Sequence, residues 1–302
     1  MDNDHFTRSD LAYEKRTVLP SSDKDWQKDH GIDYSERTVR GVRVATLEIV
    51  NDEGADLIGK PCGKYVTVFC GKVRSYEEDS FQKTAKTISE SIRSLILSMT
   101  EKRNGISVLV VGLGNREMTA DAIGPATTDR ILVTRHLKSA DGELWKSLKV
   151  YEVSAFSPGV LGQTGIETVE LVRGASGTVH PDVIIVIDAL AARSLETLAS
   201  TVQLSNTGIE PGSGIGNRRL AIDRNSLGVP VLSIGVPTVV DSSTLVYDAL
   251  KKAGVDEISA DLRDVLESGR GFFVSPKDTD VICDEMASLL AEAIDMALSH
   301  AE

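Results

Sequence analysis

The stretch "DVIIVIDAL", residues 182–190, decides the fold of this chain. Its near-continuous run of Val and Ile predicts a strand that is buried on both faces of a sheet. A second run of this kind, "ISVLVVGLG" at 106–114, predicts another buried strand. Shorter apolar stretches predict three more strands, at 148–154, 199–206 and 230–237.

Segments with the apolar spacing of helices alternate with these strands, at 77–105, 121–137, 166–175, 242–254 and 278–300. This alternation predicts an α/β fold, a single domain with a largely parallel central sheet flanked by helices. Two stretches of alternating hydrophobicity, 42–50 and 64–71, predict further strands that we assign to the same sheet. Residues 1–40 are polar and without periodicity, and they predict an accessory N-terminal segment.

The composition bounds the class of protein. The chain has 302 residues, of which 41% are hydrophobic and 26% charged, as in ordinary globular proteins. Its net charge of −12 argues against a general affinity for nucleic acids or anionic membranes. The three cysteines show no CxxC spacing, so neither a disulfide framework nor a zinc site is expected. With no recognisable leader or membrane-length apolar run, we expect a cytoplasmic protein.

Two aspartates follow buried strands at the edge where α/β sheets place their working groups. Asp188 ends the most apolar strand, and Asp121 lies in the loop after the strand at 106–114. Two carboxyl groups brought together there would repel, so that one would retain its proton. The pair would then supply a general acid and a general base for attack of water on a carbonyl group.

Other interpretations of the same residues remain open. The two carboxylates can instead hold a divalent metal, with Glu152 or Glu167 as a further ligand, in a metal-dependent peptidase. In a purely structural interpretation, Asp121 caps a helix and Asp188 pairs with Arg193.

Three glycine-rich stretches leave a nucleotide- or peptide-binding module without catalysis as a further alternative. The stretch "GADLIGKP" at 54–61 has the spacing of a phosphate-binding loop, but Pro61 stands where a hydroxyl group is required. The stretch "VGLGN" at 111–115 has only two of the three glycines of a dinucleotide fingerprint. The loop "PGSGIGNRR" at 211–219 has two arginines with which to bind an anion.

Several long motifs resemble those of the germination protease family of spore-forming bacteria, also called spore protease or small acid-soluble spore protein endopeptidase. They include "VGLGNREMTADAIGP" at 111–125, "SAFSPGVLGQTGIET" at 154–168 and "VIIVIDALAARS" at 183–194. The stretches "VQLSNTGIEPGSGIGNRR" at 202–219 and "PVLSIGVPTVVD" at 230–241 resemble the family as well. The resemblance covers nearly the whole chain.

The resemblance implies an endopeptidase that degrades small acid-soluble spore proteins during spore germination, in the forespore or spore core. It implies a fold similar to that of hydrogenase maturation endopeptidases and a hydrolase of atypical aspartic type. The family's catalytic aspartates fall on Asp121 and Asp188. The resemblance further implies a homotetramer, and our hypothesis includes no cofactor, no metal ligands, no direct contact with nucleic acid and no membrane.

The resemblance also implies a zymogen that removes its own N-terminus by cutting after an acidic residue. The stretch "RSDLAYE" at 8–14 resembles a cleavage site, with Asp10 before the bond and Leu11 after it. It departs from the pattern at Tyr13, where a small residue is expected. We therefore predict an autocleaved pro-segment at 1–10 and a single α/β peptidase domain at 11–302.

An acidic residue before the cut bond requires a cationic pocket. Arg193, Arg218 and Arg219 lie on the two loops nearest the predicted site, and we predict that they bind the substrate. Arg135, on the helix predicted after Asp121, is a weaker candidate.

Overall fold

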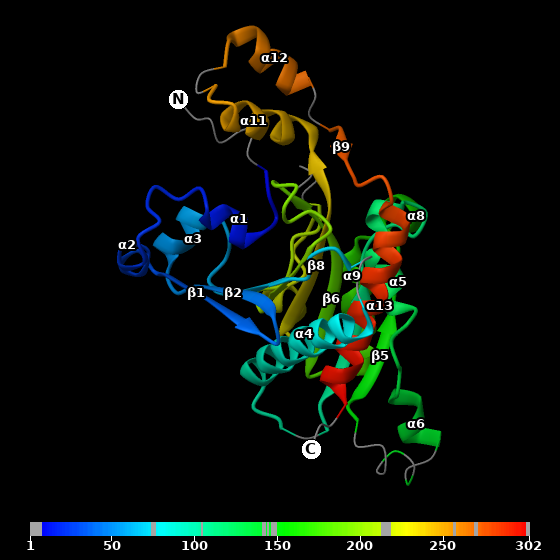
Figure 1. Ribbon diagram of the computed structural model, residues 1–302. Helices are drawn as coiled ribbons and strands as arrows, with labels where there is room; N and C mark the ends of the chain where they lie inside the picture. Colours follow the sequence, from blue (N-terminus) through cyan, green and yellow to red (C-terminus); the bar gives the residue numbers. More distant parts are fainter. Residues whose placement is uncertain are drawn as a thin grey trace.

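The computed structural model describes residues 8–73, 77–103, 105–140, 143, 145, 150–212, 219–255, 258–268 and 271–299. The described strands form one nine-stranded sheet in the order β1-β2-β3-β7-β8-β6-β4-β5, with β9 paired to β8 (Figure 1). The strands are β1 (Ile32–Val39), β2 (Val42–Ile49), β3 (Gly63–Phe69), β4 (Ser107–Gly112), β5 (Glu152–Phe156), β6 (Val183–Ala192), β7 (Thr201–Ser205), β8 (Val231–Asp241) and β9 (Phe273–Val274).

The predicted α/β fold with parallel central strands is confirmed. Strand β6 lies between β4 and β8 and runs parallel to both, and β5 extends the parallel part beyond β4. The stretch 184–187 of β6 is completely buried, as its run of Val and Ile predicts.

The other half of the sheet is antiparallel. Strand β7 pairs antiparallel with β8, and β3, β2 and β1 follow as an antiparallel series. The early strands therefore do belong to the same sheet, as predicted. The interpretation of residues 1–40 as a mere accessory segment is wrong, because β1 pairs with β2 along its whole length. Most side chains of β1 are exposed, which explains why its sequence shows no apolar pattern.

The helices cover both faces of the sheet. Ile185 and Ile187 of β6 belong to a core cluster that includes α4 and α13, which cross one face together (Figure 1). Ile184 and Val186 point to the other face, where α9 packs. The helices are α1 (Ala12–Arg16), α2 (Lys24–Asp29), α3 (Asp52–Ile58), α4 (Glu78–Met99), α5 (Ile123–Thr128), α6 (Arg135–Ala140), α8 (Leu161–Thr164), α9 (Thr168–Val179), α10 (Arg224–Leu227), α11 (Ser242–Lys252), α12 (Ala260–Ser268) and α13 (Thr279–Leu298).

The turn after β4 brings a 3₁₀ turn, Thr119–Asp121, to the carboxyl edge of the parallel strands. Gly114 makes this possible, because a Cβ atom there would lie 1.9 Å from the carbonyl oxygen of Asp121. Its φ of +112° is also in the region that favours glycine. In the part of the chain that the structure describes, no helix has both the length and the apolar character to cross a bilayer.

Candidate active site

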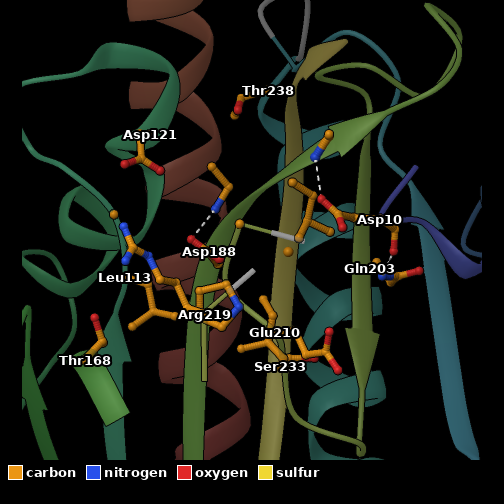
Figure 2. Close-up of a pocket in the computed structure, with 18 of the residues that line it drawn as sticks. Asp10, Leu113, Asp121, Thr168, Asp188, Gln203, Glu210, Arg219, Ser233 and Thr238 are labelled. Carbon is orange, nitrogen blue, oxygen red and sulfur yellow. Dashed lines mark hydrogen bonds between the residues drawn. The ribbon is translucent and has the colours of Figure 1, made fainter. Parts of the chain in front are cut away.

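A cavity of about 940 Å³ opens at the carboxyl edge of the parallel strands (Figure 2). Residues that follow β4, residues at the end of β6 and residues of β8 contribute to its lining. Asp121 and Asp188 both line it, so the sheet brings the two predicted aspartates into one cavity. The N-terminal segment enters the same cavity with Arg8, Ser9 and Asp10.

Asp188 is a buried carboxyl group that favours its protonated form. Its side chain is 6% exposed, and its Oδ1 accepts a hydrogen bond from the backbone N–H of Ala189 at 3.0 Å. Burial, followed by the charges of Asp121 and Asp10, raises the pKa of Asp188 well above its usual range. A carboxyl group that keeps its proton near neutral pH can act as an acid.

Asp121 also lines the cavity and is less deeply buried than Asp188. Its Oδ2 accepts a hydrogen bond from the backbone N–H of Asn115 at 2.7 Å. Burial raises the pKa of Asp121, and the bond from Asn115 opposes that increase by stabilising the carboxylate. Asp121 is therefore the more readily ionised of the two carboxyl groups.

Asp10 is a third carboxylate in this cavity. Its backbone N–H donates to the carbonyl oxygen of Ala191 at 2.9 Å, and the N–H of Ala191 donates to Asp10 Oδ2 at 2.9 Å. These two hydrogen bonds hold the N-terminal segment against the end of β6, just beyond Asp188 (Figure 2). Asp10, at the predicted cleavage site, thus lines the same cavity as the two predicted catalytic residues, which the sequence gives no sign of.

Leu11 follows Asp10 into an apolar pocket. It is completely buried and clusters with Leu190, Ala192 and Val240. Its backbone is extended, with φ of −83° and ψ of 118°, and α1 begins at the next residue. The bond between Asp10 and Leu11 therefore lies in extended backbone at the end of the docked segment.

Glu14 fastens the segment from the other side and was not predicted from the sequence. It is 3% exposed, and its carboxylate accepts from the backbone N–H groups of Arg193 at 2.7 Å and Ser194 at 2.9 Å. The hydroxyl groups of Ser9 and Thr197 also donate to it. A charged residue in a polar stretch carries no local signal of such burial.

The structure separates the predicted arginines. Arg219 lines the cavity. The guanidinium of Arg193 instead donates three hydrogen bonds to the carboxylate of Asp248 at 2.7 to 3.1 Å, so the interpretation of Asp188 as its partner is wrong. Arg218 lies outside the described residues. Arg135 forms an ion pair with Glu152 at 3.4 Å.

The further carboxylates considered as metal ligands also lie apart. Glu167 lines the cavity and takes part in a capping box at the start of α9. Glu152 begins β5, at the amino end of the parallel strands, where Lys138 also pairs with it. Among the described residues, no group of three or more His, Cys, Asp or Glu side chains is arranged to hold a metal ion.

Comparisons with known proteins identify relatives along the whole chain. The model of the germination protease family matches residues 8–253. The germination protease of Caldanaerobacter subterraneus is 38% identical over 314 residues, which cover 96% of this chain and 94% of that one. The germination protease of Clostridium perfringens is 36% identical over 319 residues, with 96% and 94% covered. That of Bacillus velezensis is 41% identical over 253 residues, with 82% and 67% covered.

Solved structures similar to this chain include the [NiFe] hydrogenase maturation protease HycI from Thermococcus kodakarensis, which is 15% identical to this chain with a TM-score of 0.33. The match covers 67% of this chain and 98% of HycI.

Proposed function

The chain belongs to the germination protease family, and we propose that it is a self-processing endopeptidase that degrades small acid-soluble spore proteins during spore germination. In this proposal Asp121 and Asp188 are the catalytic pair, and cleavage follows an acidic residue. The observation that carries it is that Asp10 lines the cavity that holds both aspartates, while Leu11 next to it is buried against Leu190, Ala192 and Val240.

The two protonation states divide the chemistry between the aspartates. Ionised Asp121 takes a proton from water, and the oxygen of that water bonds to the carbonyl carbon of the acidic residue. Protonated Asp188 gives its proton to the nitrogen as the carbon–nitrogen bond breaks. The products are a carboxyl terminus and an amine, and proton exchange with solvent returns each aspartate to its starting state.

The N-terminal segment indicates how a substrate binds. The backbone N–H of Asp10 donates to the carbonyl oxygen of Ala191 on β6, and the carboxylate of Asp10 accepts from the N–H of Ala191. The side chains on the two sides of the bond lie in different surroundings, one polar and one apolar. The acidic residue before the bond is held by the N–H of Ala191, and the apolar residue after it by Leu190, Ala192 and Val240. Arg219, on the lining of the cavity, adds positive charge to the recognition of acidic substrates.

This arrangement supports cleavage between Asp10 and Leu11, with residues 1–10 as the pro-segment and 11–302 as the peptidase domain. It also accounts for Tyr13, which replaces the small residue expected there. The ring of Tyr13 packs edge-on against Phe69 at 5.0 Å, and its hydroxyl accepts from Arg43 at 2.8 Å. A large residue is accommodated because this position lies over β3.

Assembly as a homotetramer in the forespore or spore core is part of the same proposal. The region around α11, α12 and β9 supports a subunit contact, because it exposes several large apolar side chains. These are Val246, Val265, Phe272 and Val274.

Intact-mass measurement during incubation at mildly acidic pH tests the proposal. We expect the parent protein to lose the mass of Met1 to Asp10, and the Asp188→Asn variant to stay intact. An added small acid-soluble spore protein should be cut by the parent alone. Equal mass loss in both proteins would exclude Asp188 from the chemistry, and an intact parent that also spares the added substrate would contradict the peptidase function.

A further inference from the structure

Gln203, on β7, contacts the backbone on both sides of the Asp10–Leu11 bond. Its Nε2 donates to the carbonyl oxygen of Asp10 at 3.2 Å, and its Oε1 accepts from the backbone N–H of Ala12 at 2.7 Å. The side chain is 7% exposed. These partners fix the orientation of the amide, because a carbonyl oxygen requires a donor and an N–H requires an acceptor.

The contact explains why the chain stays extended at this bond. Ala12 is the first residue of α1, and the first N–H groups of a helix have no partner within the helix. Gln203 supplies the missing acceptor, so α1 begins directly after Leu11 and not before it. The carbonyl group of Asp10 then remains outside the helix, directed at the amide nitrogen of Gln203 (Figure 2).

The sheet register places Gln203 in line with Asp188. Gln203 pairs with Gly235 of β8, and Gly235 pairs with Asp188 of β6. Side chains in one row of a sheet point to the same face, and neighbouring strands lie about 4.8 Å apart. Gly235 has no side chain and so leaves space between Gln203 and Asp188. The side chain of Leu190 fills this space and clusters with Leu11.

We propose that Gln203 positions the peptide bond to be cut, both in the pro-segment and in protein substrates. This inference rests on the proposed peptidase function and adds a residue to it. Gln203 donates to the carbonyl group of the acidic residue and accepts from the N–H of the second residue after the bond. Since that carbonyl oxygen gains negative charge when water attacks, a fixed donor stabilises the reaction's transition state.

Gln203→Met tests the inference, because methionine has a similar length and neither donor nor acceptor strength. Removing one such donor is expected to slow self-cleavage by about a hundredfold or more. Gln27→Met is the matched control. Gln27 is also a buried glutamine with two contacts, from Arg16 at 2.9 Å and to the carbonyl oxygen of Ser21 at 2.8 Å, but it lies outside the cavity lining.

Gln203→Glu provides a readout that a merely structural role would not change. An ionised glutamate still accepts from the N–H of Ala12 but cannot donate to the carbonyl group of Asp10. Protonation restores a donor, so the rate of this variant relative to the parent should rise as the pH falls. Thermal denaturation of each variant shows that it is folded under the assay conditions.

The outcomes separate the two proposals. A parent protein that cuts neither itself nor an added spore protein would overturn the peptidase function and this inference with it. A parent that cuts while Gln203→Met cuts equally fast would overturn only the role of Gln203. A constant rate ratio between Gln203→Glu and the parent across the pH range would do the same.

Discussion

Asp10 and Asp188 lie in one cavity although they come from distant parts of the chain, and the charge of Asp10 acts on Asp188. Burial is the largest cause of the raised pKa of Asp188, and Asp121 and Asp10 add to it. The residue before the proposed cleavage site therefore helps to keep the proposed acid protonated.

Asp10→Asn should lower the pKa of Asp188, because the variant removes a negative charge while its side-chain oxygen still accepts from Ala191. The measurement is a carbon-13 NMR titration of the aspartate carboxyl groups. It is made in an Asp121→Asn background so that the chain does not cut itself. An unchanged titration of Asp188 would show that the two charges do not interact.

Asp188→Asn should stabilise the protein near neutral pH while it abolishes cleavage. Because the pKa of Asp188 is raised in the folded state, the unfolded chain releases this proton first as the pH rises. Stability is then fully present below the unfolded pKa of about 3.9 and falls as the pH rises toward the folded pKa. We expect the Asn variant to have a higher free energy of unfolding than the parent at pH near 7 and nearly the same free energy of unfolding at acid pH.

Thermal denaturation of both proteins across this pH range measures the effect. Asp129→Asn is a control of opposite sign, because a hydrogen bond from Arg116 lowers the pKa of that exposed carboxyl group. The loss of stability in Asp129→Asn should be small and confined to pH values above the pKa of this group in the unfolded chain. Parallel curves for the parent and Asp188→Asn would contradict the assignment of a protonated Asp188.

Glu14→Ala should release the N-terminal segment. The substitution leaves the buried N–H groups of Arg193 and Ser194 without their acceptor, and each such group costs about 1 to 3 kcal/mol. Urea denaturation should show that the free energy of unfolding falls by about 3 kcal/mol in total. Limited proteolysis should cut within residues 8–16 faster than in the parent. Glu14→Gln keeps one carbonyl oxygen as an acceptor, so its stability and its rate of proteolysis should lie between those of the parent and Glu14→Ala. Resistance to proteolysis equal to that of the parent in Glu14→Ala would contradict the anchoring role.

Arg219→Ala and Arg193→Ala should differ in their effect. Arg219 lines the cavity, so its loss should raise the KM for substrates with an acidic residue before the cut bond. Arg193 is engaged with Asp248, and its loss should lower stability by about 1 kcal/mol with a smaller change in KM. Steady-state kinetics on peptides with Glu or Gln before the bond measure the preference. Equal KM values in the parent and both variants would remove the arginines from substrate recognition.

The sequence predicts the parallel strands and both aspartates because these features depend on local patterns. A run such as Val183–Ile187 is readable by itself, and strand ends converge wherever strands are parallel. Asp10, Glu14 and Gln203 are different. The contacts of each residue are made between the N-terminal segment and β6 or β7, which are distant in the sequence. A single polar residue in the sequence does not indicate such a contact. The edge strand β1 escaped prediction for a related reason, since backbone pairing rather than burial holds it.

The docking of Asp10 on Ala191 joins residues that are 181 positions apart, and this has a consequence for biosynthesis. The N-terminal segment leaves the ribosome first, but β6, β7 and the pocket around Leu11 are made only much later. The N-terminal segment therefore cannot bind to its site in the fold early in synthesis, because that site does not yet exist. The cavity is therefore completed only late in translation, so the proposed self-cleavage cannot begin before most of the chain has been made.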